Sequence, residues 1–151
     1  MAFDDARSAA EKFCNAYDGA FGKFNLGDDC DRGFATATHE LKSRYTSASI
    51  VMFSVEDDIS GVYSEKVEFV KEKSKPTVMG KPTLISKKFG FDEEYGTITN
   101  FSMMGQKGGF VYYAAHTGKS LMCAQLFSLQ GNISDDDLSS VMRVIIESAK
   151  N

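Results

Sequence analysis

The residues that most resemble a chemical motif form the segment His116-Thr-Gly-Lys-Ser120, which ends like a phosphate-binding loop. The complete motif requires a glycine five residues before Gly118, and Tyr113 occupies that position. It also requires a helix after the loop, so that backbone amides face the phosphate, whereas Leu121–Phe127 is predicted as a strand. We therefore interpret the segment as a hairpin turn with Gly118 in a left-handed conformation, and we expect no nucleotide binding there.

Three side chains could serve a nucleophilic or zinc-dependent reaction, namely His39, His116 and Cys123. A zinc site needs three or four ligands, and the spacing of these residues does not indicate one. A cysteine nucleophile needs an ionised thiol beside a base, whereas a thiol within an apolar strand is inert. We expect Cys123 to be a small core residue and both histidines to lie at the surface or in turns. An enzyme that uses these three residues is kept as an alternative.

Two acidic clusters have the chemistry of metal ligands without the spacing. Residues 25–32 form a polar loop that carries Asp28, Asp29 and Asp31. A calcium loop has its glycine between the acids and a glutamate after them, and this loop has neither. The second cluster, Asp135–Asp137, follows Ser134, and Ser134 with Asp137 has the spacing of a helix capping box. We predict a solvated loop, a capped helix, no metal and no cofactor.

Composition and charge restrict the class of protein. The chain has 151 residues, enough for one domain with a core, and a formal charge of −4, which argues against nucleic-acid and anionic-membrane partners. No stretch approaches the roughly 18 apolar residues of a membrane span. The acidic start Met1–Asp5 is unlike a signal peptide. We expect a soluble, cytoplasmic protein, or a periplasmic or secreted one if a signal peptide has been removed.

The odd cysteine count fits free thiols in a reducing compartment, with a Cys14–Cys30 disulfide as the alternative. Asn100 and Asn132 begin N-glycosylation sequons, which matter only on a secretory route.

The elements that must position these residues follow from the spacing of apolar side chains. Apolar residues three and four apart predict a helix from Ala2 to about Phe24, which ends near Asp18 if Gly19 closes it. Alternation and β-formers predict strands over Thr46–Val55, Val62–Lys71, Thr83–Phe91, Tyr95–Met104, Phe110–His116 and Ser120–Leu129, and Phe34–Tyr45 is ambiguous. Glu56–Gly61 and Gly105–Gly109 are predicted turns, and a wide apolar stripe predicts a helix from Ser134 to Ala149.

Consecutive strands with short connections predict an antiparallel sheet. We therefore expect a single α+β domain over residues 1–151, with a sheet of about five or six strands flanked by an N-terminal and a C-terminal helix in two layers.

Two features could bind a partner protein. A local basic excess in an acidic chain could attract an acidic partner or could guard an edge strand, and its residues are Lys71, Lys73, Lys75 and Lys81. The apolar stripe of the first helix, with Phe13 and Tyr17, could pack on its own domain or on a partner or second copy.

Residues 100–110, the hairpin through Gln125-Leu-Phe-Ser-Leu129 and the closing helix from Ser134 resemble the C-terminal part of class I type III secretion chaperones. Those bacterial proteins are small, acidic and open with an N-terminal helix. The resemblance implies a non-catalytic chaperone that binds another protein, with a homodimer as a further implication. The family has a helix between its third and fourth strands that usually builds the dimer interface, whereas Lys81–Thr99 is predicted as strands.

The absence of a recognisable catalytic pattern favours a non-catalytic protein-binding module of the chaperone, adaptor or inhibitor/immunity type. The alternative is a domain that binds a small apolar ligand in a cavity between the sheet and the C-terminal helix, because phenylalanine and methionine are abundant.

Overall fold

The computed structural model describes residues 3, 5–12, 24–25, 34–40, 46–76, 80–128 and 131–149. Its strands are β1 Phe24–Asn25, β2 Phe34–Glu40, β3 Thr46–Val55, β4 Thr83–Leu84, β5 Glu93–Met103, β6 Gln106–Thr117 and β7 Ser120–Ser128. Its long helices are α2 Ile59–Lys73 and α3 Asp135–Ala149, and residues 6–12 are also helical.

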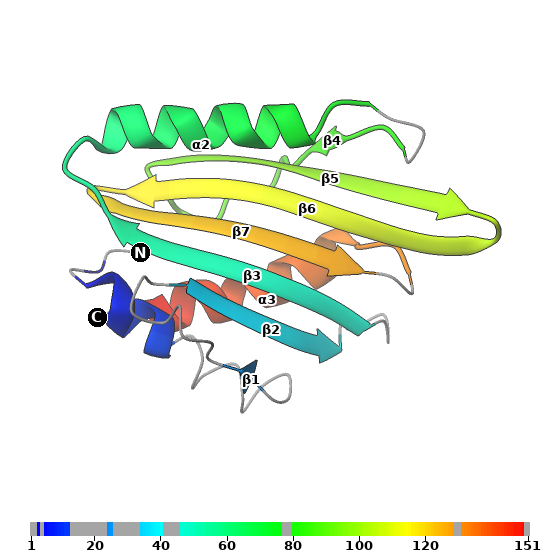
Figure 1. Ribbon diagram of the computed structural model, residues 1–151, viewed down its shortest axis with the longest axis horizontal. Coiled ribbons are helices and arrows are strands. Elements are labelled where there is room, and N and C mark those ends of the chain that lie inside the picture. Colours follow the sequence, from blue (N-terminus) through cyan, green and yellow to red (C-terminus); the bar gives the residue numbers. More distant parts are fainter. Residues whose placement is uncertain are drawn as a thin grey trace.

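All the strands belong to one sheet with the order β1-β2-β3-β7-β6-β5-β4, and every neighbouring pair is antiparallel (Figure 1). Five long strands form most of the sheet, and two strands of two residues lie at its edges. The predicted α+β class, with an antiparallel sheet and helices near both ends of the chain, is confirmed. Because β7 pairs with both β3 and β6, the β6–β7 hairpin occupies the centre of the sheet.

Both central hairpins turn in two residues, with positive φ angles at both residues of the β5–β6 turn and at Gly118 of the β6–β7 turn. Gly118 has φ 55°, so the predicted left-handed turn between β6 and β7 is confirmed. Met104 and Gly105 have φ 51° and 81°, as in a type I′ turn, whose twist matches that of the strands. The turn therefore consists of Met104 and Gly105 and is shorter than the predicted turn over Gly105–Gly109. Gly108 and Gly109 belong to β6, where an added Cβ would meet the ring of Phe101 and the side chain of Asn100.

One face of the sheet is closed by helical residues 6–12, α3 and the loop before β5. The core there contains Val51 and Phe53 of β3, Val111 of β6 and Met142 of α3, all fully buried, while Phe3 packs edge-on against Phe53 at 5.5 Å. The apolar stripe predicted for α3 is confirmed, because Leu138, Val141, Met142 and Ile145 are at most 1% exposed.

The prediction of a strand over Val62–Lys71 is wrong, because this segment lies in helix α2. β-branched and aromatic residues favour strands, but Tyr63, Val67 and Val70 also share one face of a helix at four- and three-residue spacing. That face packs on Ala114 and Leu121. Asp58, taken as part of a turn, caps the helix by accepting a hydrogen bond from the Gly61 backbone N–H at 3.3 Å.

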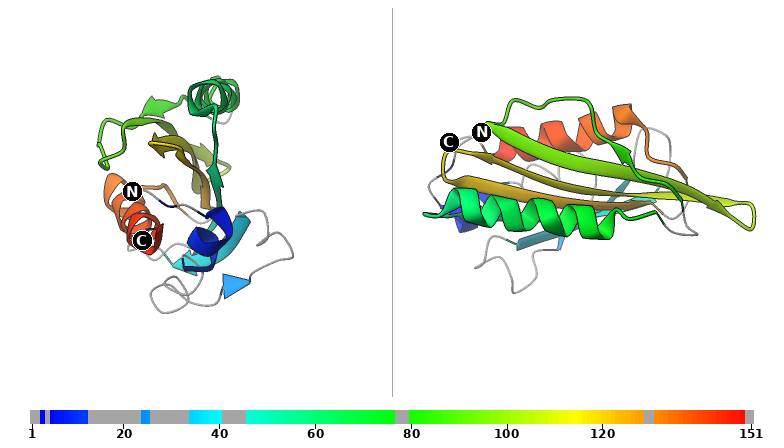
Figure 2. Two further views of the ribbon diagram at one scale, coloured as in Figure 1. Left: turned by 90° about the vertical axis from the view of Figure 1, so that its left-hand side faces the viewer. Right: turned by 90° about the horizontal axis from the view of Figure 1, so that it is seen from above.

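Helix α2 adds a layer that the two-layer prediction omitted, since it and α3 pack on opposite faces of the sheet (Figure 2). The strand predicted over Thr83–Phe91 is also shorter, because only Thr83–Leu84 is a strand. The chain after β4 leaves the sheet so that Phe89 and Phe91 pack against the ring of Tyr113 at 6.0 and 6.2 Å.

The predicted capping box at the start of α3 forms and gives a first test of the structure. The Asp137 N–H donates to Ser134 Oγ and the Ser134 N–H donates to Asp137 Oδ2, both at 3.1 Å. We expect Ser134→Ala and Asp137→Ala each to lower the free energy of unfolding by about 1 kcal/mol in urea titrations. The exposed Asp136 is the control, because Asp136→Ala removes only a helix-dipole contribution of about 0.3 kcal/mol. Equal losses in all three variants would contradict the capping geometry.

Candidate functional site

The sheet face that carries α2 is only partly covered. Strict alternation in β6 places Phe110, Tyr112, Ala114 and His116 on this face. Helix α2 has 15 residues and spans about 22 Å, whereas the 12 residues of β6 span about 40 Å. Ala114 is therefore buried under the helix, while Tyr112 and Phe110, farther along the strand, keep part of their surface exposed.

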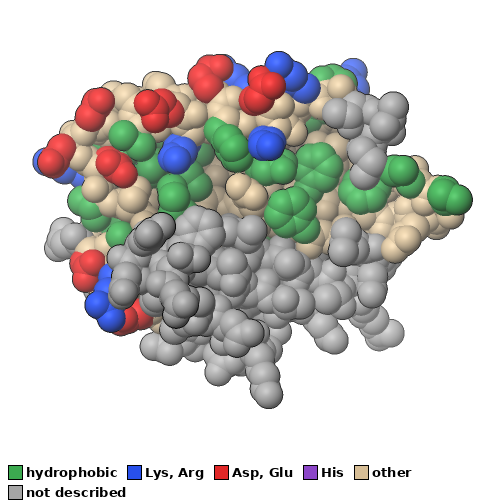
Figure 3. Space-filling view, viewed as in Figure 1, with side chains coloured by type: hydrophobic (Ala, Val, Ile, Leu, Met, Phe, Trp, Pro, Cys, Tyr) green, Lys and Arg blue, Asp and Glu red, His purple; other side chains and the backbone are tan. Residues whose placement is uncertain are grey.

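Five rings on this face are connected through contacts between neighbouring rings. We call them the aromatic row: Phe69 of α2, Phe101 of β5, Phe110 and Tyr112 of β6, and Phe127 of β7. Tyr112 is the hub, with ring centroids 6.1 Å from Phe69, 5.6 Å from Phe110 and 6.3 Å from Phe127, all nearly perpendicular. Phe101 extends the row from Phe110 at 6.4 Å. Phe69 is 43% exposed and the other four are partly exposed. Hydrophobic side chains accordingly gather over the sheet beside α2 (Figure 3).

A cavity of about 140 Å³ opens between α2 and the sheet at one end of the aromatic row. Its walls include Met52, Phe69, Val70, Tyr112 and Cys123, and Lys66 is the one charged side chain among the described residues that line it. The lining residues given for this cavity belong to α2 and the sheet, whereas the predicted ligand cavity was placed between the sheet and the C-terminal helix.

Cys123 has the environment of a core residue, as predicted. Burial raises the pKa of its thiol to about 11, although the nearby Lys66 ammonium acts in the opposite direction. A thiol with this pKa is almost entirely protonated at neutral pH and is a poor nucleophile. The imidazole of His116 forms no hydrogen bond with this thiol, because both of its ring nitrogens have other partners.

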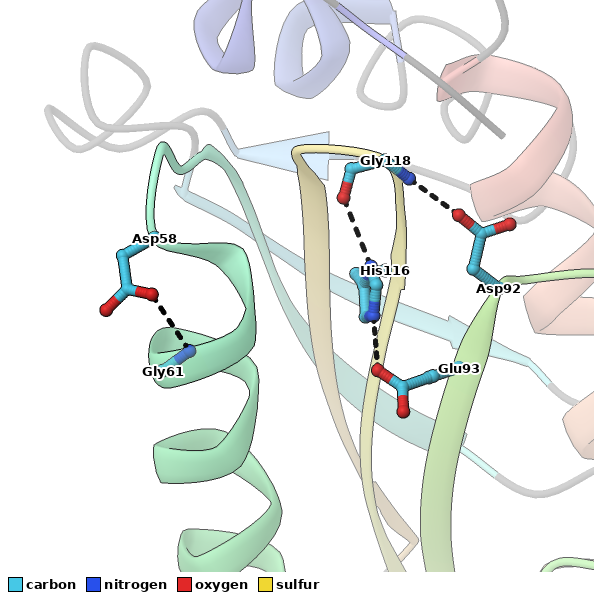
Figure 4. A network of polar contacts seen from close by, with 6 residues as sticks. All are labelled: Asp58, Gly61, Asp92, Glu93, His116 and Gly118. Carbon is cyan, nitrogen blue, oxygen red and sulfur yellow. Dashed lines mark hydrogen bonds and ion pairs between the residues drawn. The ribbon is translucent and has the colours of Figure 1, made fainter.

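His116 lies at the end of β6, beside the β6–β7 turn, and is only 8% exposed, so of the two predicted positions, surface or turn, it is not at the surface (Figure 4). Its Nε2 lies 2.7 Å from Glu93 Oε2 and its Nδ1 lies 3.1 Å from the Gly118 carbonyl oxygen. The ring also packs against Tyr63 at 4.9 Å. Asp92 accepts a hydrogen bond from the Gly118 N–H at 2.8 Å. These contacts hold the β6–β7 turn and leave neither nitrogen of His116 directed at a substrate.

The other residues of the segment that resembles a phosphate-binding loop also have structural partners. Lys119 pairs with Asp57 at 3.0 Å, which connects the turn to the start of α2. The hydroxyl of Ser120 donates to the Phe3 carbonyl at 2.8 Å and accepts from the Phe3 N–H at 2.9 Å. The segment that follows is strand β7. The interpretation as a hairpin turn is confirmed.

Asp92, Glu93 and Glu94 line an open depression but do not converge on a point in it. Glu94 accepts hydrogen bonds from the backbone N–H groups of Phe89 and Phe91 and, at 2.6 Å, from the Tyr113 hydroxyl. Within the described ranges, no group of three or more His, Cys, Asp and Glu side chains is placed to hold a metal ion. The loop aspartates Asp28, Asp29 and Asp31 lie outside those ranges.

The predicted basic patch is divided among several contacts around the end of α2. Lys71 lies 3.5 Å from a Glu68 oxygen and 5.6 Å from the centre of the Tyr95 ring. Lys73 lies 5.6 Å from the centre of the Phe69 ring and so borders the aromatic row. Lys75 pairs with Glu72 at 2.7 Å, and Lys81 is exposed before β4.

The remaining predicted residues are placed as follows. Phe13, Tyr17, Cys14 and Cys30 lie outside the described residues, and His39 belongs to β2. The carboxamide of Asn100 binds both backbone groups of Ile133, at 2.8 and 3.0 Å, and so connects β5 to the segment before α3. The aromatic row was missed, although Phe110 and Tyr112 stand two residues apart in a strand and so share a face.

No protein-family model and no curated protein matches the chain. Among solved structures, it is similar to PA94 from Pseudomonas aeruginosa, a protein of unknown function, with 8% identity, a TM-score of 0.38 and coverage of 78% of this chain and 80% of that one. It is also similar to LpqN of Mycobacterium tuberculosis, which is involved in cell envelope biogenesis, with 12% identity, a TM-score of 0.37 and coverage of 81% and 76%. Likenesses this distant carry no inference about function. Neither α2 nor α3, the long helices of the described chain, is long and apolar enough to cross a membrane.

The environment of Cys123 predicts a slow thiol. In a Cys14→Ser, Cys30→Ser variant, Cys123 is the one remaining cysteine. With a pKa of about 11, roughly one thiol in a thousand is ionised at pH 8, against about one in four for an exposed cysteine. We expect iodoacetamide to alkylate the folded variant about a hundredfold more slowly than the same chain in 8 M urea, with a rate that still rises above pH 10. Equal rates in both states would show that Cys123 is accessible and ionised.

Proposed function

We propose that this protein is a non-catalytic protein-binding module that captures a partner on the aromatic row beside α2. The observation that carries the proposal is a contiguous set of five partly exposed rings on a face that α2 is too short to cover. Contiguous exposed apolar surface of this kind marks interaction sites, and aromatic residues are enriched at the centres of protein interfaces.

The chemistry of the polar residues supports a binding role over catalysis. Two side chains that could act as base or nucleophile are described. The imidazole of His116 is bound to Glu93 and to the Gly118 carbonyl, and burial keeps the Cys123 thiol protonated. An active site normally brings together several polar groups around a space for substrate. The cavity under α2 has mainly apolar walls instead.

Within the binding class, we favour a chaperone or adaptor over an inhibitor. Class I type III secretion chaperones have a helix between their third and fourth strands, and the sequence did not predict such a helix here. In the structure, α2 lies between β3 and β4. That helix usually builds the dimer interface of the family, so α2 would be the element that a homodimer uses. Under this proposal, the protein acts in the cytoplasm of a bacterium.

A domain for a small apolar ligand is the second candidate, since the cavity has an apolar lining. Its volume of about 140 Å³ is well below the roughly 300–1,000 Å³ of typical small-molecule sites. The size therefore favours the protein-binding proposal.

Site-specific photocrosslinking in the native host tests the proposal. Benzoylphenylalanine would replace Phe110 or Phe127 in the aromatic row, or the exposed Arg143 of α3 as a matched control. We expect the two row positions to give the same discrete crosslinked protein, and position 143 to give none. Circular dichroism of each purified variant would verify folding. Crosslinks that are absent at both row positions, or equally strong at position 143, would overturn the proposal.

A further inference from the structure

The cavity under α2 has mainly apolar walls and a lysine at its edge, and this combination indicates what it binds. We propose that it is the anchor pocket for one apolar side chain of the partner protein, and that Lys66 at its edge pairs with a carboxylate next to that side chain. This inference rests on the proposed function and names the chemistry that the partner must present.

The volume decides between a free ligand and a side chain. A cavity of about 150 Å³ in another protein holds a single benzene ring, and this cavity measures about 140 Å³. Its volume therefore matches one leucine- or phenylalanine-sized group. Because Phe69 and Tyr112 line the cavity and also belong to the aromatic row, an occupant of the cavity continues directly onto the row. That continuity fits a polypeptide whose side chain is anchored in a pocket while its neighbours cover the rings.

The charge of Lys66 indicates which chemical group lies next to the apolar side chain in the partner. Lys71, Lys75 and Lys119 each lie within 4 Å of a carboxylate, whereas Lys66 forms no ion pair within the described part of the chain. Its neighbours one helical turn away, where a partner carboxylate would normally stand, are Val62, Tyr63, Phe69 and Val70.

Among the described side chains, those of the sheet that face Lys66 across the cavity carry no carboxylate, since they are Met52, Tyr112, Cys123 and Gln125. The Lys66 residue is half-buried, so an ion pair formed there is less screened than one on an open surface. An incoming carboxylate supplies the missing counter-charge. The pocket thus selects an apolar group that has an acidic neighbour and disfavours one that has a basic neighbour.

Two ring-bearing probes of opposite charge test this selection directly. Phenylacetate and phenethylammonium each carry one benzene ring and one charge, and both would be titrated into isotope-labelled protein by NMR. We expect shifts centred on Phe69, Cys123 and Gln125, and about fivefold tighter binding of phenylacetate. Lys66→Gln should abolish the preference and Lys66→Glu should reverse it. Lys107→Gln, an exposed lysine on the β5–β6 hairpin, is the control that should change nothing.

An unchanged amide spectrum outside the pocket would verify that each Lys66 variant is folded. Equal affinity for the two probes in the native protein, or shifts centred elsewhere, would overturn the anchor pocket. Crosslinking from Phe110 and Phe127 would still stand in that case, so the two proposals fail separately.

The source of the apolar group is identified by benzoylphenylalanine at Phe69, which lines the pocket. Mass spectrometry of the crosslinked product should find a partner peptide in which an aspartate or glutamate adjoins an apolar residue. A crosslink to a free small molecule, or to a peptide without an acidic residue, would overturn the assignment of the partner.

Discussion

The alternation of side chains along β6 is the constraint on which both faces of the molecule depend. Val111, Tyr113 and Ala115 point into the core under α3, and the residues between them point toward α2. Because β6 lies next to the central strand β7, a shift of one residue in their pairing would exchange the two sets. The register is held at one end by the turn at Gly118 and by the contacts of His116. The same contacts therefore keep the core closed and the aromatic row partly exposed.

The residues that resemble catalytic motifs are used to connect elements that are far apart in the chain. Lys119 and Ser120 bind the start of α2 and the N-terminal segment, respectively, and Glu94 binds the loop before β5. Such polar contacts require defined donors and acceptors, so short motifs of Gly, Lys, Ser, His and Asp arise for structural reasons alone. This use of the polar residues leaves binding, through apolar surface and one unpaired lysine, as the function that the described residues support best.

Local signals in the sequence predicted the class of fold, the β6–β7 hairpin, its left-handed glycine and the capping box of α3. They failed for residues 62–71, where residue type and spacing disagree. Val62, Tyr63, Val67 and Val70 are residue types that favour a strand, but their spacing is that of one face of a helix. Of the predicted lysines, Lys73 does lie beside Phe69 of the aromatic row, but Lys66 was not singled out. Its role depends on which residues of β6 and β7 face it, and pairing across the sheet is not visible in a single sequence.

One face of the sheet is sealed, whereas the other presents aromatic rings to solvent. Fluorine NMR of protein labelled with fluorophenylalanine measures this difference directly when a soluble gadolinium chelate is added. Resonances of Phe101, Phe110 and Phe127 should broaden, whereas those of Phe3 and Phe53, which are 3% and 0% exposed, should stay sharp. Equal broadening of both groups, or sharp lines for the aromatic row, would contradict the account.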